Sequence, residues 1–300
     1  MAVMIRINNG ISVFKKVLIV VNFLIFLVLI VFNQQASVPS KVFPKRTGEV
    51  SDKYETDLSP AGATFAIWSV IYLLQAAWII YSLTLLVRPE SPDILPTEFY
   101  AFYILSQFSN ISWLILWAHG EVTISFVVLV LITVSLDICF AIASRSLNKY
   151  LNELSSDDSS RLSKVDLWLV RFLVQNGIIF YIAWVSIASC INAAVSMQAD
   201  LHFSRSKAGA ISLSFLLATV VIWSILENFV FRKFTRFVAA EYIVLILGSS
   251  GVLAKQWTDG SGNQAFVLCI LIVSVLLFGL RLTLLFVRKG DGCRGEQTKA

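Results

Sequence analysis

Long apolar stretches alternate with short polar ones along most of this chain. Each apolar stretch is about 17 to 25 residues long, which is the length that an α-helix needs to cross the hydrocarbon core of a bilayer. We predict eight membrane-spanning helices, at residues 17–33, 62–87, 99–117, 122–144, 175–198, 209–227, 237–254 and 264–287. The pattern therefore predicts an all-α, polytopic membrane protein.

The composition excludes a soluble globular protein. Of the 300 residues, 57% are hydrophobic and only 14% are charged, whereas soluble domains carry about a quarter charged residues. The net charge of +5 would suggest a nucleic-acid partner in a soluble protein, but in a membrane protein basic residues commonly set the orientation. We therefore expect the lipid bilayer, and no nucleic acid, as a partner.

Lysine and arginine residues are distributed unevenly between the two sides of an eight-helix arrangement. Sixteen lie on the side of the two chain ends and seven on the other side. Because basic residues accumulate on the cytosolic side, both termini are predicted to be cytosolic. The membrane of residence stays open between the mitochondrial outer membrane, the endoplasmic reticulum and the plasma membrane.

Two connections are unusually long. The polar segment 33–59 contains Pro39 and Pro44, and we expect it to form a lid or an ordered cap. The segment 146–165 is read as a solvated linker without function inside a 145–174 loop, although residues 165–174 could lengthen the fifth helix beyond the membrane.

Aromatic and weakly polar residues recur at helical spacing inside the apolar stretches. Three sets have this property: Trp68 with Tyr72; Asn110 with Trp113 and Trp117; and Tyr181, Trp184, Ala188 and Asn192. Separations of three, four or seven residues place the members of each set on one helix face. Such faces suit a flat apolar ligand, because rings stack on it while Asn and Tyr side chains orient it.

Three segments resemble signatures of the TspO/MBR family, the tryptophan-rich sensory proteins and mitochondrial translocator proteins. Residues 59–72, Ser-Pro-Ala-Gly-Ala-Thr-Phe-Ala-Ile-Trp-Ser-Val-Ile-Tyr, resemble the family's second helix. Asn110 and Trp113 resemble its third-helix Asn-x-x-Trp, and residues 181–192 match its fifth-helix Tyr-x-Ala-Trp-x-x-x-Ala-x-x-x-Asn. The resemblance covers about residues 17 to 198.

The resemblance implies a five-helix bundle with a pocket that is closed by the first long loop and binds tetrapyrroles, sterols or synthetic apolar compounds. No cofactor is required, and a porphyrin or heme is a candidate ligand. The residues expected to line or support the pocket are Phe65, Trp68, Tyr72, Asn110, Trp113, Tyr181, Trp184, Ala188 and Asn192.

The resemblance also implies a domain organisation. A cytosolic tail (1–16) precedes the bundle (17–198), and three additional transmembrane helices (199–287) are followed by a second cytosolic tail (288–300). The additional helices either pack on the bundle or occupy a surface that short family members use to dimerise, so a homodimer stays open.

Two departures from the family pattern limit what the resemblance implies. The first removes an aromatic residue that would clasp the ligand, and the second weakens the expectation of sterol binding. The family's Pro-Pro-aromatic sequence before the second helix is replaced by Ser59, Pro60 and Ala61. The Tyr that follows the fifth-helix Asn in mammalian translocator proteins, read as part of a sterol motif, is missing from residues 193–198.

Other interpretations of the same residues stay open. Asn110 and Asn192 could bond a neighbouring helix, and Trp113 and Trp184 could pack the bundle. A separate interpretation is an interaction subunit without its own ligand, in which the core behind Trp184 is closed.

A transporter or channel would instead use the intramembrane charges Asp137 and Glu241 together with Arg281. The commoner expectation is that Glu241 pairs with Arg236 and that Arg281 reaches the membrane surface. The sequence has no catalytic set, phosphate loop or metal-ligand cluster, so neither an enzyme nor a metal site is supported.

Overall fold

The computed structural model describes residues 11–88, 93–153, 161–259 and 263–297. Throughout these ranges the regular structure is helical, and no strand is formed. Seven helical segments in this part of the chain are long and apolar enough to cross a membrane. They are built from α1 (Val13–Gln35), η1 (Gly62–Ala66) with α3 (Ile67–Thr84), α4 (Thr97–His119), α5 (Val122–Glu153), α6 (Arg161–Leu169) with η2 (Val170–Gln175) and α7 (Asn176–Ala199), α8 (Arg205–Ile225) with η3 (Leu226–Val230), and α10 (Gln264–Gln297).

Each of the eight predicted spans coincides with a helix. The span predicted at 237–254 forms α9 (Ala240–Asp259), which is not among the seven segments. Polar and charged residues near both of its ends, Glu241 and Lys255 among them, lower its overall hydrophobicity. The prediction of an all-α polytopic membrane protein is confirmed, with α9 as its most polar long helix.

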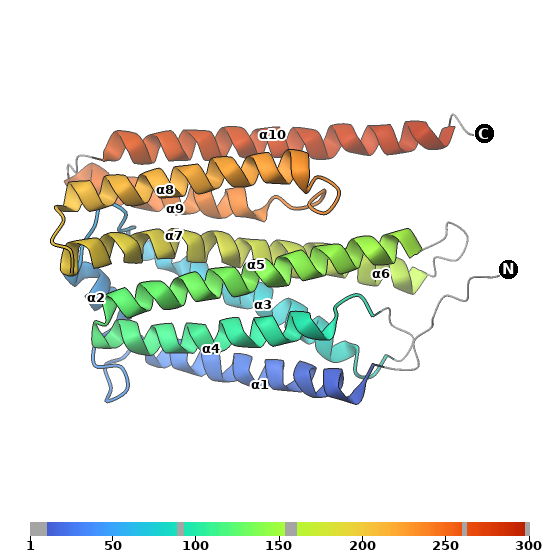
Figure 1. Ribbon diagram of the computed structural model, residues 1–300, viewed down its shortest axis with the longest axis horizontal. Coiled ribbons are helices and arrows are strands. Elements are labelled where there is room, and N and C mark those ends of the chain that lie inside the picture. The colour runs from blue at the N-terminus through green and yellow to red at the C-terminus, as the bar shows by residue number, and fades with distance from the viewer. Residues whose placement is uncertain (1–10, 89–92, 154–160, 260–262, 298–300) are drawn as a thin grey trace.

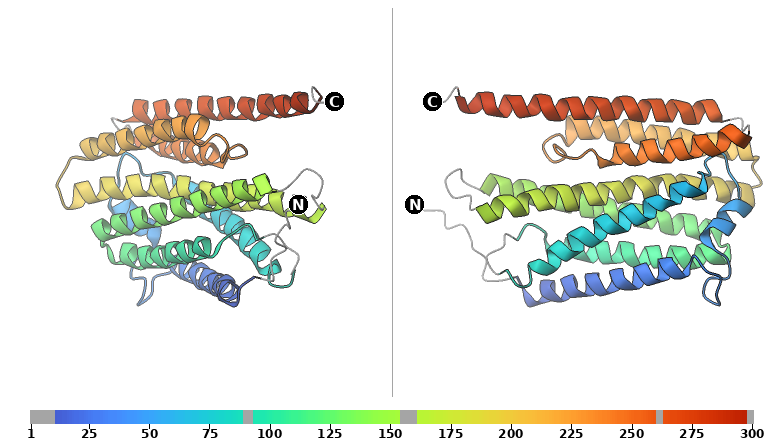
Figure 2. Two further views of the ribbon diagram at one scale, coloured as in Figure 1. Left: turned by 45° about the vertical axis from the view of Figure 1, so that its right-hand side comes forward. Right: turned by 180° about the vertical axis from the view of Figure 1, so that it is seen from behind.

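The helices lie side by side in one elongated bundle with α7 at its centre (Figure 1). Helix α7 contacts α5, α8 and α9, and 83% of the most apolar part of its span is buried. Helices α1 and α10 form opposite edges of the bundle (Figure 2). Of the three C-terminal helices, α8 and α9 pack on α7, and α10 packs on α8 and α9.

The start of α1 and the end of α10 lie at the same end of the bundle (Figure 1). This placement of the two helix ends agrees with an even number of membrane crossings between them. Which side of the membrane this end faces stays a prediction.

The second long connection contains more helix than predicted, whereas the first is ordered as expected for a cap. The expected 145–174 loop is mostly helical, because α5 continues to Glu153 and α6 and η2 lead directly into α7. The alternative, in which residues 165–174 lengthen the helix of the fifth predicted span, is confirmed, and residues 154–160 lie outside the described part. The polar segment 33–59 contains helix α2 (Thr47–Lys53), so it forms an ordered cap.

Candidate functional site

Trp68 lies at the centre of a group of aromatic side chains. Its indole stacks on Tyr72 and Trp113, with ring centroids 5.7 and 5.9 Å apart. The rings of Tyr181 and Trp184 meet it edge to face, at 6.1 and 6.3 Å. The three helix faces recognised in the sequence therefore meet around one residue, at distances typical of favourable ring pairs.

Phe65 completes this group from η1. Its ring lies edge to face with Trp184, at 6.4 Å between centroids. Phe65 and Trp68 are half-buried, whereas the other members are buried. We call these six residues the aromatic cluster: Phe65, Trp68, Tyr72, Trp113, Tyr181 and Trp184.

The two asparagines behave differently. The Asn110 amide donates a hydrogen bond to the Tyr181 hydroxyl, which joins α4 to α7 as expected for helix-to-helix bonding. The Asn192 amide donates to the Ala188 carbonyl of its own helix at 3.1 Å, so the same expectation is wrong for Asn192. Ala188 and Asn192 share the face of Tyr181 but lie about 10 and 16 Å further along α7, beyond the reach of its ring.

Four buried polar atoms at these residues have no hydrogen-bond partner within the described part of the chain. They are the indole nitrogens of Trp113 and Trp184 and the amide oxygens of Asn110 and Asn192. Buried polar groups in folded proteins are nearly always paired, because leaving one unpaired costs about 1–3 kcal/mol. The four atoms belong to α4 and α7, and other buried atoms of the described chain, such as both amide atoms of Gln256, are also unpartnered.

A second buried aromatic group further along α3 and α4 shows the contrast. There the Trp78 indole donates to Gln75 Oε1 at 2.8 Å, and the Tyr103 hydroxyl donates to the same oxygen at 3.1 Å. The Gln75 amide in turn donates to the Gly177 carbonyl at 2.9 Å. This group is satisfied by the protein alone, as a structural core should be.

Sequence reasoning missed a residue of α1 that contacts the cluster. The Tyr72 hydroxyl donates to Asn33 Oδ1 at 3.4 Å. Asn33 ends an apolar stretch and lies seven residues after Phe26, whose ring meets Tyr72 edge to face at 6.5 Å, so the same spacing rule would have selected it.

Helix α9 closes the cluster through two glycines. A Cβ atom at Gly248 would lie 2.8 Å from Ile187 Cδ1 and 3.9 Å from the Trp184 ring, and one at Gly251 would overlap the Thr64 side chain. The Ala61 amide also donates to the Gly251 carbonyl at 3.0 Å. The run Gly248-Ser-Ser-Gly251 was the sequence signal for this close approach.

The ordered cap is fixed to the cluster end of α4. Trp117 stacks on Trp113 at 6.1 Å, and its indole donates to the Thr47 carbonyl of α2 at 3.1 Å. The cap therefore contacts the aromatic residues through Trp117.

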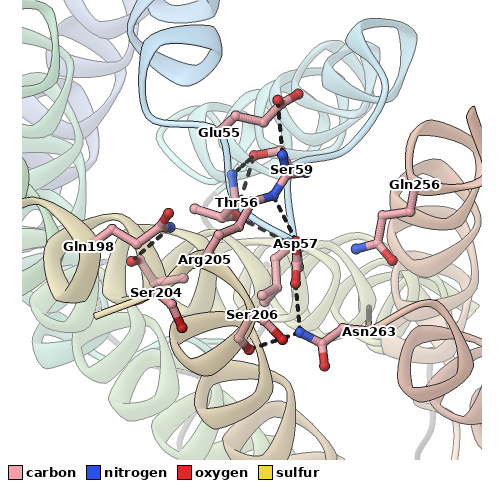
Figure 3. A network of polar contacts seen from close by, with 12 residues as sticks. Glu55, Thr56, Asp57, Ser59, Gln198, Ser204, Arg205, Ser206, Gln256 and Asn263 are labelled. Atoms are coloured by element: carbon pink, nitrogen blue, oxygen red, sulfur yellow. Dashed lines mark hydrogen bonds and ion pairs between the residues drawn. The ribbon is translucent and has the colours of Figure 1, made fainter. Parts of the chain in front are cut away.

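The end of the cap is held to the C-terminal helices by a polar latch (Figure 3). Asp57 is buried and accepts hydrogen bonds from Arg205 Nε at 2.7 Å and from the Asn263 amide at 2.6 Å. Glu55 accepts from Arg205 at 3.2 Å and pairs with Lys255 at 2.8 Å. We call these five residues the latch; they join the cap to α8, α9 and the start of α10.

The latch makes stability depend on pH. The hydrogen bond from Lys255, with Arg205 nearby, holds the pKa of Glu55 below its ordinary value despite partial burial. A carboxyl with a lowered pKa contributes stability above its unfolded pKa and loses it as pH falls. We expect the melting temperature of the detergent-solubilised protein to fall between pH 5 and pH 3, as pH drops through the lowered pKa of Glu55, with less than about 1 kcal/mol from this partly exposed pair.

A Glu55→Gln variant separates this contribution from other acid effects. The fall in melting temperature between the two pH values should be smaller in the variant than in the native protein. Equal falls would show that the ion pairs of Glu55 contribute nothing measurable.

The charges proposed for a transporter site do not all meet. Glu241 and Arg281 lie together with Glu227, a residue that sequence reasoning missed, whereas Asp137 is exposed on α5. The expectation that Arg281 reaches the membrane surface is wrong, since the side chain is 1% exposed and is held by the residues around it.

A family model described as TSPO-like protein matches residues 19–283, which includes the three C-terminal helices. No curated protein and no solved structure shows a significant match. The match spans most of the chain, and the chain belongs to the TSPO-like protein family.

Proposed function

We propose that this integral membrane protein binds a flat, apolar ligand with several rings at the aromatic cluster, and that it acts as a sensor or translocator of that ligand. Membership of the TSPO-like family and the convergence of six aromatic side chains support the proposal. Small-molecule sites have this character, with an apolar lining and a few polar groups that orient the ligand.

The observation that carries the proposal is the set of unpartnered polar atoms at the cluster. Beside the cluster, Trp113 and Trp184 each present a buried indole donor and Asn110 presents a buried acceptor, while Asn192 presents a further buried acceptor at a later position on α7. The group around Trp78 differs, because its polar atoms are paired within the protein. A bound molecule that supplies the missing partners would remove the cost of burying them.

The same atoms favour a tetrapyrrole over a sterol. Two donors and two acceptors suit a ligand that carries several polar groups of both kinds on a flat ring system, as a tetrapyrrole does. A sterol has one hydroxyl group and would leave most of these atoms unpaired. The missing Tyr after Asn192 also counts against a sterol.

Titration of the purified full-length protein with protoporphyrin IX tests the proposal. We expect saturable quenching of tryptophan fluorescence, and at least about tenfold weaker binding in a Trp184→Leu, Asn192→Leu variant, because one aromatic stack and one polar contact are lost. Trp257→Leu is the matched control, since Trp257 is exposed on α9 and should leave the affinity unchanged.

Size-exclusion chromatography confirms that each variant is folded before its affinity is compared. The proposal is wrong for tetrapyrroles if the native protein shows no saturation. If the double variant binds as tightly as the Trp257→Leu control, the ligand does not bind at Trp184 and Asn192.

A further inference from the structure

Three ionisable side chains are buried together in the C-terminal part of the bundle, away from the aromatic cluster. Glu227 of η3 is 0% exposed, Glu241 of α9 is 3% exposed and Arg281 of α10 is 1% exposed. Charged groups are costly in an apolar interior unless they are paired. Each of the three charged side chains is therefore expected to have a partner.

The Arg281 guanidinium is fully engaged. Its Nε donates to the Val238 carbonyl at 2.8 Å, and it donates further to Asn228 Oδ1 at 3.1 Å and to the Thr235 carbonyl. It also lies 2.9 Å from Glu227 Oε1. Arg281 thus balances one carboxylate and fastens the connection between η3 and α9.

Glu227 and Glu241 carry two negative charges when both are ionised, and Arg281 balances only one of them. Glu227 Oε2 accepts a hydrogen bond from the Tyr242 hydroxyl at 2.8 Å, and Glu241 Oε1 accepts one from the Trp223 indole at 3.3 Å. Glu241 Oε2 is buried and has no donor within the described part of the chain. With both acids ionised, the group would hold a net charge of minus one in an apolar environment.

The two carboxyl groups lie within hydrogen-bonding reach of one another. Two ionised carboxylates cannot share a hydrogen bond, because both only accept; one proton supplies the donor and makes the group neutral. The other ionisable groups that act on the pair are Arg281 of α10 and Tyr242 of α9.

The local backbone adds a second observation. Glu227 lies in a π-helical turn, where the Phe231 amide donates to the Leu226 carbonyl five residues earlier at 2.7 Å. Such turns are rare and are found frequently at functional sites. If the group served only to neutralise Arg281, Glu227 would suffice, and Glu241 would add a buried acid without benefit.

We propose that Glu227 and Glu241 form a binding site for a single proton, which they share, with Arg281 as the counter-charge. The proton lies between Glu241 Oε2 and the Glu227 carboxyl group. The site belongs to the three C-terminal helices and is independent of the ligand proposed for the aromatic cluster.

Infrared spectroscopy of the full-length protein in lipid nanodiscs tests this assignment. At pH 7 we expect the carbonyl stretching band of one protonated carboxyl group per chain, shifted in deuterated water. Glu227→Gln and Glu241→Gln should each abolish it, because one acid then remains to pair with Arg281. Glu49→Gln is the matched control and should leave the band in place, since Glu49 lies on the exposed surface of the cap. Asp137→Asn is measured alongside, because Asp137 also lies in a membrane-spanning helix.

Three results would overturn the proposal. One is the absence of the band in the native protein, a measurement that does not depend on the folding of any variant. Another is a band that disappears in Asp137→Asn and persists in both glutamine variants. The third is a higher melting temperature in sodium chloride than in choline chloride that depends on Glu241, which would assign the site to sodium.

Discussion

Replacing Arg281 with methionine is expected to destabilise the protein by about 3–5 kcal/mol, the largest effect of any single substitution considered for this chain. Methionine has a similar length, so packing is largely kept while the guanidinium is removed. Glu227 then loses its cation, and the carbonyl groups of Thr235 and Val238 lose their donor. The change should appear as a large drop in the melting temperature of the detergent-solubilised protein.

Arg46→Met is the matched control, because Arg46 pairs with Glu49 on the exposed surface of the cap. It should cost less than about 1 kcal/mol. Adding Glu227→Gln and Glu241→Gln to Arg281→Met removes both orphaned acids and should recover part of the loss. Similar melting temperatures for Arg281→Met and Arg46→Met would refute a structural role for the buried group.

Gly251→Ala is expected to destabilise the protein by about 1–3 kcal/mol, although alanine is the better helix former. The added methyl group would lie 2.7 Å from Thr64 Cγ2, a separation that real side chains do not reach. Helix α9 must then move away from η1, which also disturbs the α9 contact beside Trp184. We expect both a lower melting temperature and weaker porphyrin binding.

Gly279→Ala provides the comparison, because a methyl group at Gly279 of α10 meets nothing within 4 Å. There the helix preference acts alone, and stability should be unchanged or slightly higher. Thr64→Ala in the Gly251→Ala background removes two of the three contacting atoms and should restore part of the loss. Equal stability of the Gly251→Ala and Gly279→Ala proteins would contradict a close contact between Gly251 and Thr64.

Local periodicity was sufficient to predict the helices and most members of the aromatic cluster. Spacings of three, four and seven residues depend only on helix geometry, so they identified the faces of Trp68, Asn110 and Tyr181 before any packing was known. The same argument could not place Asn192, because sharing a face says nothing about distance along the axis. Its amide is satisfied partly by its own helix.

Contacts between distant parts of the sequence could not be predicted in the same way. Asp57 and Arg205 are separated by 148 residues, and the sequence around either residue does not indicate that the two form an ion pair. The expectation for Arg281 failed because snorkelling assumes a helix end that is open to the membrane surface. In the structure the connection between η3 and α9 covers that position.

The latch constrains how the sequence of this chain can change during evolution. The two acids of the latch find their cations on α8 and α9, and Gly248 of α9 lies against the face of α7 beside Trp184. A descendant that lost the last three helices would leave Glu55 and Asp57 without partners and uncover that face. The cap and the C-terminal helices are therefore expected to be inherited together, and a chimera that exchanges only one of them should fold poorly.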